Sequence, residues 1–388
     1  MIKTLCLKTT EADDVDAAVA ELTGQLAGET LLRHSVGIIT CFADFVSSGV
    51  VAALAGKLPF PIAGTTTIAA AVNGFQGEII LILTVFTSDD VEFVVGATGA
   101  ITAEDEAPLK AAWEAATAGK TGKPGLMLSF APLLVNIAAD FYADAWSRIT
   151  GNVPNFGTLA VDHNQDYHES QTILGKEAFR DRYIFVLFYG NAAPEFFVGG
   201  LSEEKAFREK GVVTASHGNL LKEVNGVPVA DYLASLGLEK DKNGDLKGIN
   251  SFPFILNYND GTPPVIRVMF AITPDGMAVC GGKIPTGATL MVGVINSEEV
   301  LTISSALLKK AKERARAEGT SLLIFSCVGR YFAQGLNTAA EMDKVQEILG
   351  DTPFHLSYSG TELCPVTGKD GKTANRSHND TIIICVLK

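Results

Sequence analysis

The sequence predicts a mixed α/β fold, in which two sheet-containing halves carry helices on their outer faces and pack into one body. Apolar runs rich in β-branched residues alternate along the chain with segments whose apolar residues recur at helical spacing. The 388 residues are 47% hydrophobic and 19% charged, which excludes global disorder and allows a large core. A chain of this length fits two long domains.

The first half of the chain opens with a unit typical of a parallel sheet. A β-branched run at residues 36–42 predicts a strand, and a helical pattern follows at 44–58 until Pro59 ends it. Residues 60–63 predict a second strand, which leads into a turn formed by Gly64, Thr65, Thr66 and Thr67. Two parallel strands need a crossover connection of this kind, and a helix usually supplies it.

The remaining elements alternate in the same manner. Further strands are predicted at 78–86, 91–96, 125–130, 183–189, 195–198, 251–256, 265–271, 289–294, 321–327, 354–359 and 381–387. Helices are predicted at 105–118, 133–149 and 338–349, and from a capping box at Asn296 to Glu318, where Gly319 stops the helix. A polar loop at 237–250 is expected near the join of the two halves, and no internal repeat stands out.

Charge and cysteine spacing exclude several classes of protein. The chain has 31 basic and 44 acidic side chains, and the resulting net charge of −13 would repel the phosphate backbone of a nucleic acid. Its six cysteines lie far apart, without the short spacings of zinc or redox sites. No secretory signal and no apolar run long enough to span a membrane is present, so we expect a cytoplasmic protein with reduced thiols.

Polar and reactive side chains gather in the second half, next to predicted strands. The strand at 321–325 is followed by Ser326, Cys327, Val328, Gly329 and Arg330, then by Gly335 and an acidic helix beginning near Glu341. Further on come Tyr358, Glu362 and Pro365, and then His378, Asn379, Asp380 and Thr381 before the last strand. In the first half, the strand at 36–42, the helix after it and residues 61–66 form another motif, and a third includes Val213, Thr214, Gly218, Asn219, Glu223, Asn225, Gly226, Pro228 and Tyr232.

In this order the motifs resemble the FIST (F-box and intracellular signal transduction) domain over about residues 30–387. The resemblance implies an N-terminal segment at 1–29, a FIST N-terminal domain at 30–225 and a FIST C-terminal domain at 226–388. It also implies a sensory protein that binds a small ligand, such as an amino acid, and signals through a separate partner such as a histidine kinase or a cyclic-nucleotide enzyme. Only about thirty residues precede the first motif, so we expect neither a built-in F-box nor an effector domain.

The motif residues predict a ligand site in the C-terminal half. Arg330 follows a strand end, where its guanidinium could hold a carboxylate, and Glu362 could accept hydrogen bonds from an ammonium group. The alternative is an Arg330–Glu362 ion pair that only closes two strand ends. The predicted ligand-binding residues are Arg330, Glu362, Cys327, His378, Asn379, Gly64, Thr65 and Thr66.

Two alternatives remain open at this point. Some free-standing FIST proteins resemble haem-binding nitric-oxide sensors, so haem is an alternative ligand, with His34, His163, His168, His217, His355 and His378 as candidate axial ligands. Cys327 and His378 could also form a nucleophilic pair, although a cysteine at the end of an apolar strand is usually a small buried hydrophobe. We expect no catalysis by Cys327 and no metal site.

Overall fold

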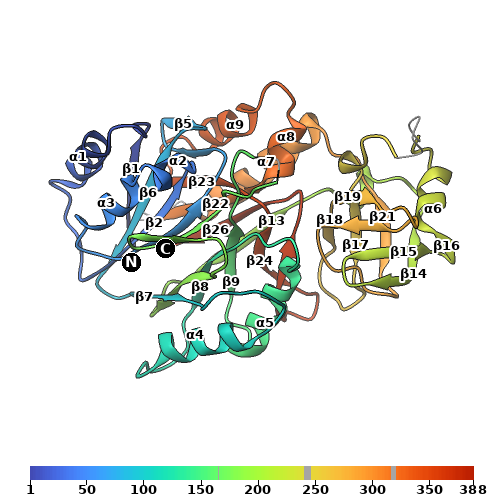
Figure 1. Ribbon diagram of the computed structural model, residues 1–388, viewed down its shortest axis with the longest axis horizontal. Helices are drawn as coiled ribbons and strands as arrows, with labels where there is room; N and C mark the ends of the chain where they lie inside the picture. Colours follow the sequence, from blue (N-terminus) through green and yellow to red (C-terminus); the bar gives the residue numbers. More distant parts are fainter. Residues whose placement is uncertain (165, 240–245, 316–319) are drawn as a thin grey trace.

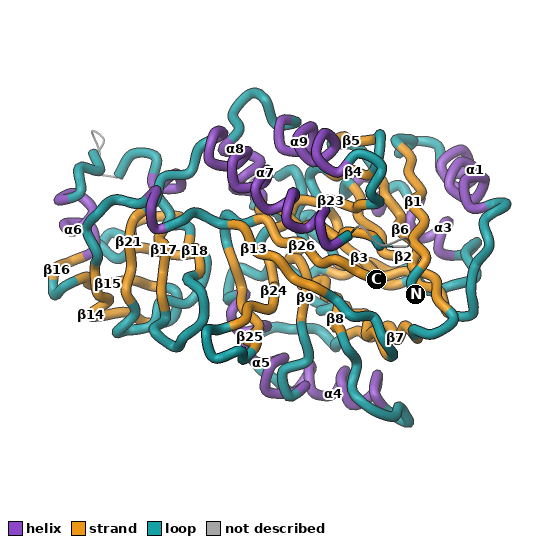
Figure 2. The backbone as a smooth tube through the Cα atoms, turned by 180° about the vertical axis from the view of Figure 1, so that it is seen from behind, coloured by secondary structure: helices purple, strands orange, loops and turns teal. Residues whose placement is uncertain are grey.

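The computed structural model describes residues 1–164, 166–239, 246–315 and 320–388, and it confirms a mixed α/β fold packed into one body (Figure 1). Within these residues the backbone forms four sheets, three with six strands and one with eight. Helices lie on the outside of the sheets, as predicted, with α4 (Ala107–Thr117) and α5 (Ala139–Thr150) on one face of the body and α7 (Ser297–Arg314), α8 (Val328–Ala333) and α9 (Ala340–Leu349) on the opposite one (Figure 2).

The three six-stranded sheets have the same arrangement of strands. The first has the order β1 (Lys3–Thr9), β6 (Leu81–Ser88), β2 (His34–Cys41), β3 (Ile62–Thr66), β10 (Thr172–Leu174) and β11 (Glu177–Phe179). The second has the order β7 (Glu92–Ala97), β12 (Ile184–Tyr189), β8 (Leu126–Ala131), β9 (Asn155–Leu159), β24 (Glu362–Thr367) and β25 (Thr373–His378). The third has the order β13 (Glu195–Gly199), β26 (Ile382–Leu387), β22 (Ser321–Cys327), β23 (Phe354–Ser359), β4 (Ala70–Val72) and β5 (Phe75–Gly77).

In each of these sheets only the central pair is parallel, namely β2–β3, β8–β9 and β22–β23. The hairpin that completes each sheet comes from a chain segment whose other strands lie in a different sheet. The hairpin β10–β11 pairs with β3, the hairpin β24–β25 pairs with β9, and the hairpin β4–β5 pairs with β23. The fold is therefore built from one unit used three times, with hairpins exchanged in a ring, a repetition that the sequence analysis did not detect.

The fourth sheet lies within the third unit, between β13 and β22, at the right of Figure 1. It comprises β14 (Gly211–His217), β15 (Leu220–Val224), β16 (Val227–Pro228), β17 (Phe254–Asn257), β18 (Val265–Arg267), β19 (Met269–Ile272), β20 (Ala278–Cys280) and β21 (Thr289–Val292), with α6 (Val229–Ser235) packed on it. Its hydrophobic core is made from its own residues, so we call residues 203–295 the inserted domain. The predicted boundary between residues 225 and 226 falls in the turn between β15 and β16.

A single core joins the three six-stranded sheets. Ile38 from the first sheet, Leu128 from the second and Phe325 from the third are fully buried in one hydrophobic cluster. The outer faces are covered separately, for example by α1 (Val15–Leu26) and α3 (Val50–Ala55) on the first sheet. No helix in the described part of the chain is both long and apolar enough to cross a membrane.

Several local predictions were wrong at their ends. The helix predicted at 44–58 is two short helices, α2 (Asp44–Ser47) and α3, because Gly49 between them takes a φ of 90°. The turn predicted at Gly64 to Thr67 is wrong for its first three residues, which continue strand β3 to Thr66. The helix predicted at 133–149 begins only at Ala139. Asn296 caps α7 as predicted, by accepting a hydrogen bond from the Glu299 backbone at 3.0 Å. The predicted helix end at residues 318 and 319 and part of the loop at 237–250 lie outside the described residues.

Candidate functional site

Most of the polar residues predicted for the ligand site meet at one place in the third unit. Cys327 ends β22, Glu362 begins β24, and His378 ends β25 directly opposite Glu362 in the antiparallel register. Asn379 and Asp380 follow in the tight turn before β26, and Asp380 takes a φ of 49°, a conformation that Asp tolerates better than most residues. All of these side chains are buried. We call this group the polar cluster.

The polar cluster is only partly satisfied by hydrogen bonds. Glu362 Oε2 accepts a hydrogen bond from Thr381 Oγ1 at 2.8 Å, and Asn379 Nδ2 donates one to Thr361 Oγ1 at 3.2 Å. The atoms without a partner among the described residues are Glu362 Oε1, Asn379 Oδ1, Asp380 Oδ2 and the two ring nitrogens of His378. Because leaving a buried polar group unpaired costs about 1–3 kcal/mol, so many at one place point to a ligand or water.

Burial controls the charge of the polar cluster. Burial raises the pKa of Glu362 well above its usual value, and the neighbouring Asp380 raises it further. Burial raises the pKa of Asp380 to about 7, against the opposing effect of the Arg330 charge. Burial lowers the pKa of His378 to about 3, so its ring is neutral at physiological pH. Burial and the two carboxyl groups raise the pKa of Cys327, which disfavours the thiolate that a nucleophile needs.

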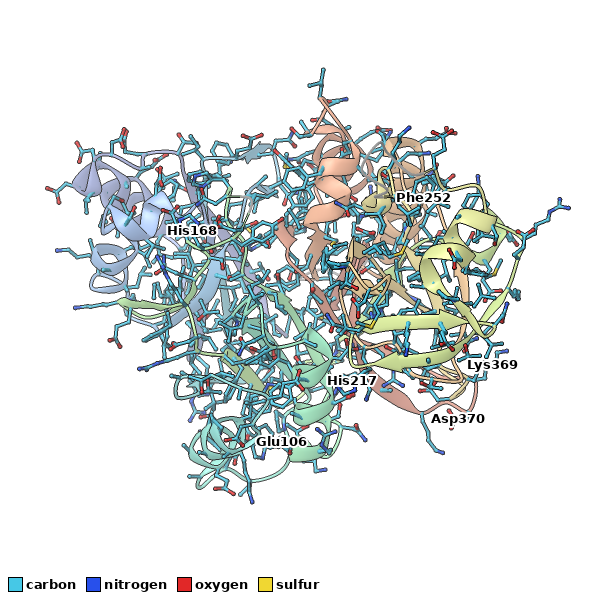
Figure 3. All side chains as sticks on the ribbon, turned by 45° about the vertical axis from the view of Figure 1, so that its right-hand side comes forward. Glu106, His168, His217, Phe252, Lys369 and Asp370 are labelled. Carbon is cyan, nitrogen blue, oxygen red and sulfur yellow. The ribbon has the colours of Figure 1, made fainter. Side chains whose placement is uncertain are left out.

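A cavity of about 980 Å³ lies next to the polar cluster, between the inserted domain and the rest of the protein. Its lining includes His378 and Thr381 on one side and Pro263, Pro264 and Ile266 of the inserted domain on the other. Phe196 of β13 and Pro365 of β24 add apolar surface, as expected for a small-molecule site with few polar groups. The far end of hairpin β24–β25, marked by Lys369 and Asp370 in Figure 3, reaches the inserted domain, where the Lys369 backbone donates to Gly261 O at 3.1 Å.

Arg330 makes no ion pair with Glu362 among the described residues, so the alternative of an Arg330–Glu362 pair is not observed, although its charge lies near enough to lower the pKa of Glu362 and of Asp380. Its fully buried guanidinium instead pairs with Glu341 of α9 at 2.6 Å. It also donates to Ser304 Oγ at 2.7 Å and to the Val300 carbonyl at 3.1 Å, both in α7. Arg330 therefore joins α7, α8 and α9. Only its Nη1 lacks a partner among the described residues.

Gly64, Thr65 and Thr66 lie in β3, and none of them hydrogen-bonds to the polar cluster. A Cβ on Gly64 would stand 1.8 Å from the Ile39 carbonyl oxygen, so glycine here allows two strands to approach closely. The hydroxyl groups of Thr65 and Thr66 donate to the Gln171 carbonyl at 3.1 and 3.3 Å. These contacts fix hairpin β10–β11 to the first sheet.

The histidines differ in the hydrogen-bond partners of their ring nitrogens. Both nitrogens of His355 are occupied, by Thr40 Oγ1 at 2.7 Å and Thr84 Oγ1 at 2.8 Å. His378 alone among them lines the large cavity with both nitrogens unpaired, within the described residues. His163 stacks on Phe42, and His168 contacts Asp166 at the surface. No three His, Cys, Asp or Glu side chains in the described ranges are arranged to hold a metal ion.

Sequence analysis missed the residues that hold the inserted domain against the body. Arg267 of β18 is fully buried, and its guanidinium donates to Asp140 of α5 at 2.7 Å and to the Ser377 carbonyl of β25 at 3.0 Å. Asp140 also accepts from the Lys283 backbone at 2.7 Å. The available signal was an arginine inside an apolar strand pattern, since a buried charge needs a partner.

Comparisons with known proteins bear on the whole chain. None of the curated proteins searched matches it. Among solved structures, a cyanuric acid hydrolase from A. caulinodans aligns over 100% of this chain and 99% of its own, at 11% identity and a TM-score of 0.38, a likeness too weak to carry an argument. The model of the FIST N domain matches residues 35–227, and that of the FIST C domain matches residues 229–365. The chain therefore belongs to the FIST family, whose domains are sensory domains of signal transduction.

Proposed function

We propose that this protein senses a small metabolite, which binds in the cavity beside the polar cluster. The observation that carries the proposal is the group of buried, unpaired polar atoms of Glu362, His378, Asn379 and Asp380 next to a cavity of about 980 Å³. The apolar wall would hold the body of the ligand, and the polar atoms would fix its orientation. Membership of a sensory family supports this assignment over an enzymatic one.

The position of the cavity suggests how binding becomes a signal. Ile266 lies on the wall formed by the inserted domain, and the next residue, Arg267, ties that domain to α5 and β25. A ligand that touches both walls favours one placement of the inserted domain, by as much as its affinities for the two placements differ. A separate signalling protein, such as a histidine kinase or a cyclic-nucleotide enzyme, would read that placement.

A thermal-shift panel of amino acids and other small metabolites tests the proposal. A true ligand raises the unfolding temperature in a concentration-dependent way. Replacing His378 by alanine should weaken that effect, while His217→Ala, at an exposed position of β14 (Figure 3), should not. For any compound that stabilises the protein, hydrogen exchange should slow at β18 and β24 and stay unchanged at β1 and β6. A panel without a stabilising compound, or one whose effects survive His378→Ala, would contradict the proposal.

Haem is a second candidate, favoured by His378. An iron ligand must be a neutral imidazole with a free nitrogen, and His378 meets both conditions beside a cavity with apolar walls. Bound haem would supply an iron that takes up nitric oxide. The visible spectrum after addition of haemin is the test. A Soret band that is lost in His378→Ala and kept in His217→Ala supports haem, and a featureless spectrum rejects it.

We also propose that the protein carries out no reaction with Cys327. Its thiol is 4% exposed and faces two carboxyl groups, and both conditions oppose ionisation. Turnover of any substrate that is lost in Cys327→Ala would refute this.

A further inference from the structure

The polar cluster has an excess of hydrogen-bond acceptors. The unpaired atoms of Glu362, Asp380 and Asn379 are all carboxyl or amide oxygens. Two of them belong to buried acids, which are expensive to ionise without a positive partner. The nearby cation, Arg330, already binds Glu341 at 2.6 Å. The cluster therefore lacks a donor with a positive charge.

The two acids, Glu362 and Asp380, are held close together by the strands around them. Asp380 Oδ1 lies 2.2 Å from the place that a Cβ on Gly329 would occupy, and Cys327 Sγ lies 3.8 Å from the same place. Thr381, the residue after Asp380, donates to Glu362 at 2.8 Å. The backbone amide of Asn379 is fixed by the Ile266 carbonyl of the inserted domain at 3.3 Å. The two acids thus lie together beside Thr381, which lines the cavity.

We propose that the ligand is a small organic cation that presents a protonated amine to Glu362 and Asp380. This inference rests on the proposed function and specifies its ligand class. An ammonium group can donate to the unpaired oxygens of both acids, and its charge compensates for theirs. A carboxylate, the group that Arg330 was expected to hold, would instead meet two acids. An alcohol would supply one donor and no charge.

The amine reaches the acids past His378 and Thr381, which line the cavity. The ring nitrogens of His378 have no partner among the described residues, so no hydrogen bond resists a rotation of the ring. The Thr381 hydroxyl makes one bond, to Glu362, which the incoming amine can replace. The His378 ring is neutral and does not repel a cation.

Cation binding also predicts a dependence on pH. In the free protein burial raises the pKa of Asp380 to about 7, and it raises the pKa of Glu362 as well. The other titratable groups that act on these acids, or are acted on by them, are Arg330 from α8 and Cys327 from β22, and Arg330 is the cation among them. An amine binds the ionised acids, so its affinity rises as pH rises through about 7, and binding releases protons.

The test compares matched probes at equal concentration and ionic strength. Butylamine, putrescine and phenylethylamine are the cations, butanol is the neutral counterpart and butyrate the anion. We expect the amines to raise the unfolding temperature of the full chain, and butanol and butyrate to leave it unchanged. Calorimetry in two buffers of different ionisation enthalpy should show protons released by wild-type protein on amine binding.

Glu362→Gln and Asp380→Asn should each weaken amine binding about tenfold or more, because each removes one charge-assisted hydrogen bond. Asp370→Asn is the matched control, since Asp370 is an exposed acid at the far end of the same hairpin (Figure 3). Equal stabilisation by butanol, binding that survives both variants, or no amine effect at any pH overturns the inference. If a carboxylate or neutral metabolite stabilises the protein through His378, the amine assignment fails and the sensor proposal stands.

Discussion

Replacing Glu341 by glutamine should destabilise the protein strongly, although Glu341 does not line the cavity beside the polar cluster. Glu341 and Arg330 are both fully buried, with Oε1 of Glu341 2.6 Å from Nη2 and 3.2 Å from Nε of Arg330. Removing one partner of a buried ion pair costs about 3–5 kcal/mol, because the other charge stays buried without compensation. The glutamine oxygen can still accept, and Ser304 and the Val300 carbonyl keep their bonds to Arg330. We therefore expect the lower end, about 3 kcal/mol.

Urea unfolding followed by tryptophan fluorescence measures this loss. The two tryptophans, Trp113 and Trp146, lie in α4 and α5 and so report on the body of the protein. The control is Glu114→Gln, which breaks an exposed pair with Lys110 and should hardly move the unfolding midpoint. The double variant Arg330→Met with Glu341→Leu should recover most of the stability, since apolar residues can replace a buried pair. A loss below about 1 kcal/mol for Glu341→Gln, or no recovery in the double variant, would refute the structural role of Arg330.

Three further predictions concern single residues. Burial raises the pKa of Asp380 from 3.8 to about 7, so the free energy of unfolding should fall by up to about 4 kcal/mol as pH rises between these two values. In urea unfolding at several pH values, Asp380→Asn should remove this part of the pH dependence. Gly64→Ala should prevent normal folding, since its Cβ would overlap the Ile39 carbonyl, whereas Gly24→Ala in helix α1, where no described atom lies within 4 Å of the new Cβ, should add about 0.5–1 kcal/mol in the same assay. Because its thiol is buried, Cys327 should not react with iodoacetamide in the native protein at neutral pH, but should react after unfolding. Fast labelling of Cys327 in the native protein, detected by mass spectrometry, would contradict this burial.

The local pattern of the sequence predicted most of the central strands. The strands that end in Cys327 and Ser359 were predicted at their observed bounds. The first contains the continuous apolar run 322–325, and the second alternates apolar and polar residues, a pattern typical of a strand. Short strands were missed, such as the hairpins β4–β5 and β10–β11. A strand of three residues carries too little periodicity to be detected, and its position depends on a partner far along the chain.

The sequence predicted four of the five residues of the polar cluster, but not Asp380. Cys327, Glu362, His378 and Asn379 were chosen from their motifs, and the structure brings them together. Arg330 was assigned to the ligand because it follows a strand end, whereas Glu341, eleven positions later, occupies its guanidinium. Which acid meets a buried base depends on how helices pack, and spacing along the chain does not specify that.

The sequence by itself determined the mixed α/β class, the family and four of the five side chains of the polar cluster, because composition, periodicity and short motifs are local properties. Only the tertiary structure decided the threefold use of one unit, the exchange of hairpins among the sheets and the placement of the inserted domain over the cavity. Those features depend on contacts such as that of Arg267 with Asp140, which lie 127 positions apart. Their stability comes from burying apolar surface, and from pairing the charges that are buried with it, between segments that no local pattern connects.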